Sequence, residues 1–161
     1  MIYRIDNILD NKFRKSVLER SKKYLKSQEE FPAGTFKVDS VLPGKQTPPD
    51  LHMKLDYGPL LLSAIRKSIG INFTIRKSWV NWTNGDKKDI CWHIHPDADY
   101  SAVWYLKTPL PFFNNGTLFK GGLFKSPQNS VLIFPADIIH TAPPSPFRLD
   151  RYTLGMDLMR R

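Results

Sequence analysis

The stretch Trp92-His93-Ile94-His95-Pro96-Asp97 decides the fold, and an apolar run over residues 100–106 follows it directly. The chain has only four histidines, and two of them lie here, one residue apart. Alternate residues of a strand share one face, so the two histidines and Asp97 lie together if the strand continues through Pro96. Two imidazoles and a carboxylate suit a divalent transition metal. The stretch therefore predicts a metal site in a β-core.

Two later segments carry further candidate site residues. The apolar run over residues 131–140 ends in His140, a third histidine that the fold could bring to the first pair. The last strand, residues 151–158, has one apolar face, and its other face carries Arg151, Thr153, Gly155 and Asp157. A planar guanidinium is well shaped to hold a carboxylate at two points. These two segments therefore predict an anion-binding group close to the histidines.

The order of the expected elements indicates an α+β fold. Apolar residues recur near helical spacing over residues 10–30, where Asp10 is a plausible N-cap, and again over residues 57–69. Residues 71–82 alternate and are rich in β-branched and aromatic side chains, which is typical of a strand. Only short strands and turns follow. We expect one domain over residues 1–161, with helical support in 1–70 and most of a double-sheet β-core, including the metal site, in 71–161.

Composition and charge restrict the setting of the protein. The chain has 161 residues, 41% of them hydrophobic, and one cysteine, Cys91. No apolar run is long enough to span a bilayer, so we expect no membrane association and a reducing, cytoplasmic location. The formal net charge is +9, and many of the cations lie in residues 12–26. This basic segment is either a solvated helix face or a patch for an acidic partner or nucleic acid.

Taken together, these motifs resemble a known family. The order His93-x-His95-Pro96, then residues 101–106, then residues 131–135 with His140, then Arg151-Tyr152-Thr153, resembles the Fe(II)/2-oxoglutarate-dependent oxygenases. It looks most like the small oxygenases related to prolyl hydroxylases. The resemblance covers residues 78–158 and adds little for the helical first half.

The resemblance implies a double-stranded β-helix, or jelly roll, with helices packed on the outside of one sheet. It implies Fe²⁺ and 2-oxoglutarate as cofactors. By this mapping His140 is the distal ligand, and Arg151, with help from Thr153, binds the far carboxylate of 2-oxoglutarate. Tyr105 and Asn81 are further candidates at the pocket wall. Trp79 could also line the pocket, although core packing is the stronger expectation for it.

One departure from the family leaves two ligand sets open. Relatives usually carry His-x-Asp as the first two ligands, whereas this chain offers His93 with His95, or His95 with Asp97. With Fe²⁺ and His140, the first set leaves a charge of +2 and the second a charge of +1. Ligand chemistry slightly favours His95, Asp97 and His140. The motif His-x-His-Pro resembles the family's own signature and keeps His93 among the candidates.

The expected activity is hydroxylation of a C–H bond with release of succinate and CO₂, on a prolyl or other peptidyl residue of a protein or peptide. One alternative is a cupin-like metalloenzyme without 2-oxoglutarate, which would have no need of Arg151 and Thr153. Another is a catalytically inactive basic module that binds nucleic acid. Loss of activity in an Arg151 variant would distinguish the first alternative from the oxygenase.

Overall fold

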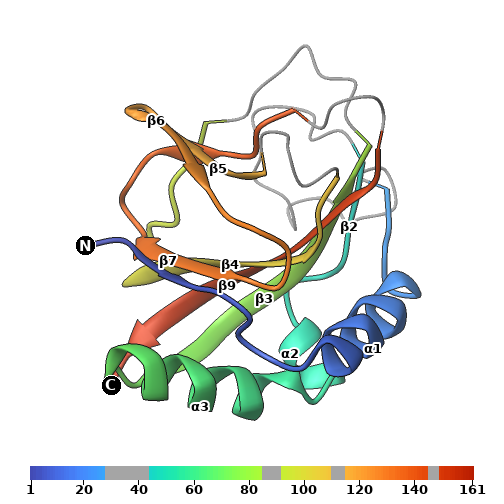
Figure 1. Cartoon of the computed structure of the whole chain (residues 1–161), viewed down its shortest axis with the longest axis horizontal. Coiled ribbons are helices and arrows are strands. Elements are labelled where there is room, and N and C mark those ends of the chain that lie inside the picture. The colour runs from blue at the N-terminus through green and yellow to red at the C-terminus, as the bar shows by residue number, and fades with distance from the viewer. Residues whose placement is uncertain (28–43, 85–91, 110–114, 145–148) are drawn as a thin grey trace.

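The computed structural model describes residues 1–27, 44–84, 92–109, 115–144 and 149–161. Two antiparallel sheets face each other across the molecule, and helices cover the outer face of the larger one (Figure 1). This arrangement confirms the predicted α+β class with a jelly-roll core and helices on the outside of one sheet.

The larger sheet has six strands in the order β1-β7-β4-β9-β3-β2. In chain order these are β1 (Tyr3–Ile5), β2 (Lys45–Gln46), β3 (Phe73–Thr83), β4 (Tyr100–Lys107), β7 (Val131–Pro135) and β9 (Arg151–Arg160). The smaller sheet has the order β6-β5-β8 and consists of β5 (Gly116–Phe119), β6 (Gly122–Lys125) and β8 (His140–Thr141). Strand β3 begins two residues later than predicted.

Three helices lie along the outer face of the larger sheet: α1 (Asn11–Lys22), α2 (Leu51–Lys54) and α3 (Tyr57–Ile69). The Asp10 carboxylate caps α1 by accepting from the N–H groups of Lys12 and Phe13, as predicted. Helix α3 has the predicted bounds, and Gly70 ends it in the left-handed conformation.

The expected length of the first helix was wrong. Helix α1 ends at Lys22, not near residue 30. The reason is tertiary pairing: Lys26 exchanges two backbone hydrogen bonds with Gln46, at 2.9 and 3.0 Å, and this bridge requires extended backbone. Pairing with a distant segment overrides the local helical pattern here.

The main hydrophobic core fills the space between the helices and the larger sheet. Strand β9 sends Tyr152, Leu154, Met156 and Leu158 into it, where they meet helical residues such as Val17 and Leu61. A smaller cluster lies between the two sheets and consists of Tyr105, Leu132 and Phe134, with Phe119 and Phe124 packed against it. The predicted alternation of the last strand is therefore confirmed. Its second face, with Arg151, looks into the space between the sheets.

No helix within the described ranges is long and apolar enough to cross a membrane.

Candidate metal centre

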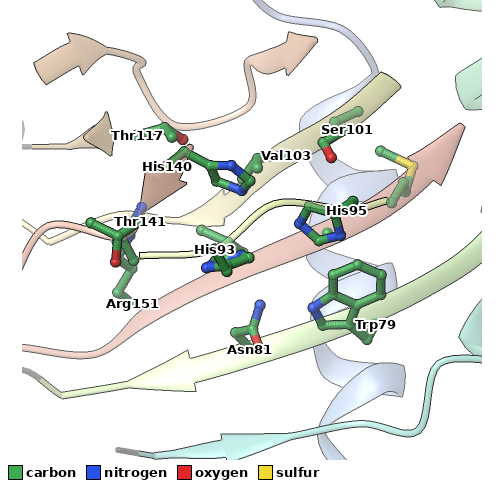
Figure 2. Close-up of a pocket in the computed structure, with 15 residues that line it drawn as sticks. Trp79, Asn81, His93, His95, Ser101, Val103, Thr117, His140, Thr141 and Arg151 are labelled. Carbon is green, nitrogen blue, oxygen red and sulfur yellow. The ribbon is translucent and has the colours of Figure 1, made fainter. Parts of the chain in front are cut away.

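Three histidines meet between the two sheets (Figure 2). His93 and His140 face each other in an antiparallel bridge, where each backbone N–H donates to the other residue's carbonyl at 3.1 Å. His95 is anchored beside them because its N–H donates to the carbonyl of Ala136 at 2.9 Å. The candidate ligand nitrogens of the three rings all lie within 4.8 Å of one another. Backbone pairing thus gathers three imidazoles around one point.

His140 is prepared to bind a metal. Its side chain is buried, and its Nδ1 lies 2.9 Å from the carbonyl oxygen of Ile138. A carbonyl only accepts, so Nδ1 carries the ring proton and Nε2 keeps its lone pair. Burial, together with the neighbouring His93, lowers the pKa of His140 to about 3. The ring is therefore neutral at physiological pH, and metal ligation requires the neutral form.

Trp79 forms one wall of the site and fixes His95. Its indole stacks on the His95 ring with centroids 5.6 Å apart and an interplanar angle of 21°. Gly155 lies opposite Trp79 in the β3–β9 pairing, and a Cβ there would come within 2.8 Å of the indole. The glycine is required for this close approach. Trp79 therefore lines the pocket, contrary to the expectation that core packing explains it.

Asp97 does not join the histidines. The chain turns after His95, with the N–H of Ala98 donating to the His95 carbonyl at 3.2 Å. This turn, with Pro96 in it, ends the alternation that would have placed Asp97 on the metal side. The Asp97 carboxylate is largely exposed and lies 3.7 Å from the Lys77 ammonium. Of the two ligand sets left open by the sequence, the structure assembles His93, His95 and His140, and the preference for Asp97 was wrong.

Arg151 is a buried cation in the same pocket. Only 4% of the residue is exposed. Its Nη2 donates to the carbonyl of Gly116 at 2.6 Å and its Nη1 to that of Pro143 at 3.4 Å. Its Nε has no partner among the described residues. Burial lowers the pKa of this guanidinium, but an arginine side chain keeps its positive charge in a protein. No carboxylate in the described part of the chain forms an ion pair with this buried charge, which indicates a site for an anionic ligand.

The carbonyl that holds Arg151 depends on a glycine. Gly116 has φ +146°, and a Cβ at this position would lie 2.0 Å from the carbonyl oxygen of Phe124. A larger residue would displace the strand end and its carbonyl. The placement of the guanidinium is therefore built into the β5–β6 pairing.

The other predicted pocket residues surround Arg151. Asn81 and Tyr105 lie on either side of Thr153 in the pairing of β3, β9 and β4. Asn81 and Thr153 line the pocket, whose volume is about 500 Å³ with the open solvent at its mouth included. Tyr105 is fully buried beneath it: its ring lies 5.8 Å from the guanidinium carbon, and its hydroxyl is 2.6 Å from that of Thr117. The structure thus brings all four residues together.

Two polar residues of the site were not predicted as functional. Asp157 is 4% exposed, and its Oδ1 lies 2.8 Å from His95 Nδ1. Ser101, its neighbour across the β4–β9 pairing, lines the pocket, and its hydroxyl has no partner among the described residues. The available signal was Asp157 itself, an acidic residue on the face that Arg151 and Thr153 share.

Three cations of the basic segment, residues 12–26, are engaged within the fold. Arg14 is buried and donates to the carbonyl of Leu106. Arg20 pairs with Asp56 at 2.9 Å, and Lys22 with Glu19 at 2.7 Å. Helix packing and surface ion pairs therefore explain some of the positive charges in this segment without a partner. A partner for this face remains a prediction.

Comparison with known proteins gives a result only at the level of structure. No family model and no curated protein matches the sequence. Among solved structures, a viral collagen prolyl hydroxylase from Paramecium Bursaria Chlorella virus-1 aligns with a TM-score of 0.65 at 15% identity, over 99% of this chain and 88% of that one. The chain has the fold of this prolyl hydroxylase.

Two further structures of the prolyl hydroxylase fold extend the comparison. A prolyl-4-hydroxylase from Pseudomonas putida aligns at 16% identity with a TM-score of 0.59, over 99% of this chain and 92% of that one. The non-heme alpha ketoglutarate dependent epimerase SnoN from nogalamycin biosynthesis aligns at 13% identity with a TM-score of 0.65, over 98% of this chain and 77% of that one. At these identities the likeness establishes the fold, and the resemblance read from the motifs is confirmed at that level.

Proposed function

We propose that this chain is an Fe(II)- and 2-oxoglutarate-dependent oxygenase that hydroxylates a C–H bond. His93, His95 and His140 hold the metal, and Arg151 binds the far carboxylate of 2-oxoglutarate. The bound metal and co-substrate supply the oxidative chemistry, in which 2-oxoglutarate is converted to succinate and CO₂ as oxygen is transferred. The protein supplies binding, orientation and a shielded pocket.

The buried guanidinium carries this proposal. Three imidazoles alone suit several metals and several enzyme classes. A buried arginine lies in the same pocket, and its Nε has no partner among the residues that the structure describes, so the pocket also favours an anion. In Figure 2, Arg151 and Trp79 lie at opposite ends of the labelled residues, with His93 between them. One pocket therefore offers a metal site and a carboxylate site to two ends of a single small molecule, as a dicarboxylic 2-oxo acid requires.

The residues of the site have separate tasks. The three histidines would hold the metal, and the pocket that they line would hold the co-substrate. Thr153 and Asn81 offer polar contacts along the pocket wall, and the Tyr105 ring supports the guanidinium. Trp79 and Val103 limit access of water to the reacting atoms. As the substrate we propose a prolyl or other peptidyl residue, because solved structures of this fold include prolyl hydroxylases.

An anaerobic titration tests the cofactor assignment. The protein is titrated with Fe(II) and then with 2-oxoglutarate, and the weak visible metal-to-ligand charge-transfer band is followed. We expect the band in the wild-type protein and its loss in Arg151→Ala. Arg160→Ala is the matched control, because Arg160 is an exposed arginine on the same strand, and this variant should keep the band.

Each contrary result has a defined meaning. Iron binding without a band in the wild type would favour the cupin-like metalloenzyme. A band that persists unchanged in Arg151→Ala would refute the role of Arg151. If no metal binds at all, the histidines are structural and the oxygenase proposal is wrong.

A further inference from the structure

Asp157 contacts one of the three histidines from behind the pocket wall. Its Oδ1 lies 2.8 Å from His95 Nδ1, and the side chains of Asp157 and His95 are 6% and 14% exposed. This oxygen has no other partner among the described residues, and its alignment with the ring nitrogen falls short of a regular hydrogen bond. No lysine or arginine within the described ranges forms an ion pair with Asp157. Burying a carboxylate is costly without such compensation. The position of Asp157 next to a candidate metal ligand therefore requires an explanation.

We propose that Asp157 is a positioning residue that prepares His95 to bind the metal; this inference rests on the proposed function. A carboxylate oxygen 2.8 Å from a ring nitrogen attracts an N–H group and repels a lone pair, so we assign the ring proton of His95 to Nδ1. Nε2 then keeps its lone pair and is the metal-binding atom. The ring is fixed on two sides, by the Trp79 indole stacked on its face and by Asp157 at Nδ1. Such partners of ligating histidines set the tautomer and increase the basicity of the ligand.

The charge of the site supports the same role. Three neutral imidazoles leave the full charge of the metal ion uncompensated, whereas two histidines and an aspartate would reduce it by one. The structure removes Asp97 from the ligands but places Asp157 against one of them. No carboxylate is among the three proposed ligands, but the carboxylate of Asp157 on β9 contacts one of them. Asp157 gives a divalent cation a compensating negative charge and leaves all three ligand positions to histidine.

Metal affinity measured apart from turnover tests this inference. Co(II) serves as an air-stable probe, and its visible absorption is titrated in the wild type, in Asp157→Asn and in Asp97→Asn. Asn keeps the shape of Asp but not its charge, so we expect Asp157→Asn to bind Co(II) about 10–100-fold more weakly. Asp97→Asn is the matched control because Asp97 lies two residues from His95 but is exposed, and its affinity should remain within about twofold.

A second readout follows the tautomer directly. In the NMR spectrum of the Co(II)-loaded protein, the exchangeable Nδ1–H proton of His95 should be visible in the wild type and lost or shifted in Asp157→Asn. A purely structural role of Asp157 would change neither this signal nor the Co(II) affinity of the folded variant. Should Asp157→Asn fail to fold, the wild type alone decides, since an Nε2-protonated His95 would overturn the inference.

The outcomes separate this inference from the proposed function. If the wild type binds Co(II) and Asp157→Asn binds it equally well with an unchanged Nδ1–H signal, the role of Asp157 is refuted and the oxygenase proposal stands. If the wild type binds neither Co(II) nor Fe(II), both proposals are wrong.

Discussion

The two faces of the larger sheet treat buried polar groups differently. On the face that the helices cover, the Ser78 hydroxyl lies 2.5 Å from that of Tyr57 and 3.0 Å from His52 Nδ1, and it accepts from the His52 N–H at 2.9 Å. On the face toward the smaller sheet, Ser101 Oγ and Arg151 Nε have no partner in the described part of the chain. On the first face these polar groups are paired with one another, whereas on the second face the two groups are available to a ligand.

This difference follows from the cost of unpaired groups. A buried polar group without a hydrogen bond costs about 1–3 kcal/mol, so a protein keeps such groups where a ligand completes them. We propose no ligand for the helix-covered face, where Ser78 is already paired with Tyr57 and His52. The contrast also separates two histidines of the same chain: His52 belongs to a structural network, and His140 belongs to the candidate metal centre.

The largest effect that this comparison predicts is on catalysis. His140→Ala removes a metal ligand and should reduce formation of succinate from 2-oxoglutarate to background. His52→Ala is the matched control on the opposite face, and it should keep wild-type turnover in whatever fraction remains folded. The measurement is succinate release with Fe(II), oxygen and ascorbate. Wild-type rates in His140→Ala would refute the metal assignment.

Much of this contrast could be predicted from the sequence. The alternation of residues 151–158 placed Arg151 and Thr153 on one face and the apolar residues on the other, because side-chain direction in a strand depends only on parity. The histidine pair and His140 were predicted as candidates, and the structure brings them together. Local pattern was sufficient wherever the chain stays in one regular element.

The errors arose where the chain leaves a regular element or pairs with a distant one. Parity predicted Asp97 as a ligand, but a turn after His95 takes it away. The contact between His95 and Asp157 joins residues far apart in sequence, and no local pattern encodes it. The end of α1 was wrong for the same reason, since its limit is set by pairing with Gln46. Tertiary contacts decide these details.

A smaller effect concerns the two buried serines on opposite faces. Ser78→Ala leaves the Tyr57 hydroxyl and the His52 N–H without their partner, so it should destabilise the protein by about 1–3 kcal/mol. At this chain length that lowers the melting temperature by about 2–4 °C per kcal/mol. Ser101→Ala removes a hydroxyl that has no partner in the described ranges, and it should leave the melting temperature of the ligand-free protein unchanged or slightly raised. Equal losses in the two variants would show that the faces do not differ as argued.

The smallest expected effects come from substitutions of the two buried tyrosines. These two variants give the most direct comparison of the two faces of the larger sheet. Each hydroxyl has a short contact, Tyr57 with Ser78 at 2.5 Å and Tyr105 with Thr117 at 2.6 Å. Tyr57→Phe should cost about 0.5–1.5 kcal/mol of stability, the net value of one hydrogen bond, and leave affinity for 2-oxoglutarate unchanged. Tyr105→Phe should cost a similar amount, but it also alters the polar surroundings of Arg151 and should weaken 2-oxoglutarate binding severalfold.

Two measurements separate stability from affinity for 2-oxoglutarate. Chemical denaturation of the ligand-free variants measures stability, and the rise in melting temperature on adding Fe(II) and 2-oxoglutarate measures affinity. A ligand that binds only the folded state stabilises it in proportion to the logarithm of its concentration over its dissociation constant. The ligand-induced rise should therefore be smaller in Tyr105→Phe than in Tyr57→Phe, although the two start from similar stabilities. An equal rise in both variants would mean that the Tyr105 hydroxyl serves only the packing between the sheets, as the Tyr57 hydroxyl serves the packing under the helices. The region prepared for the ligand would then be limited to residues that line the pocket itself.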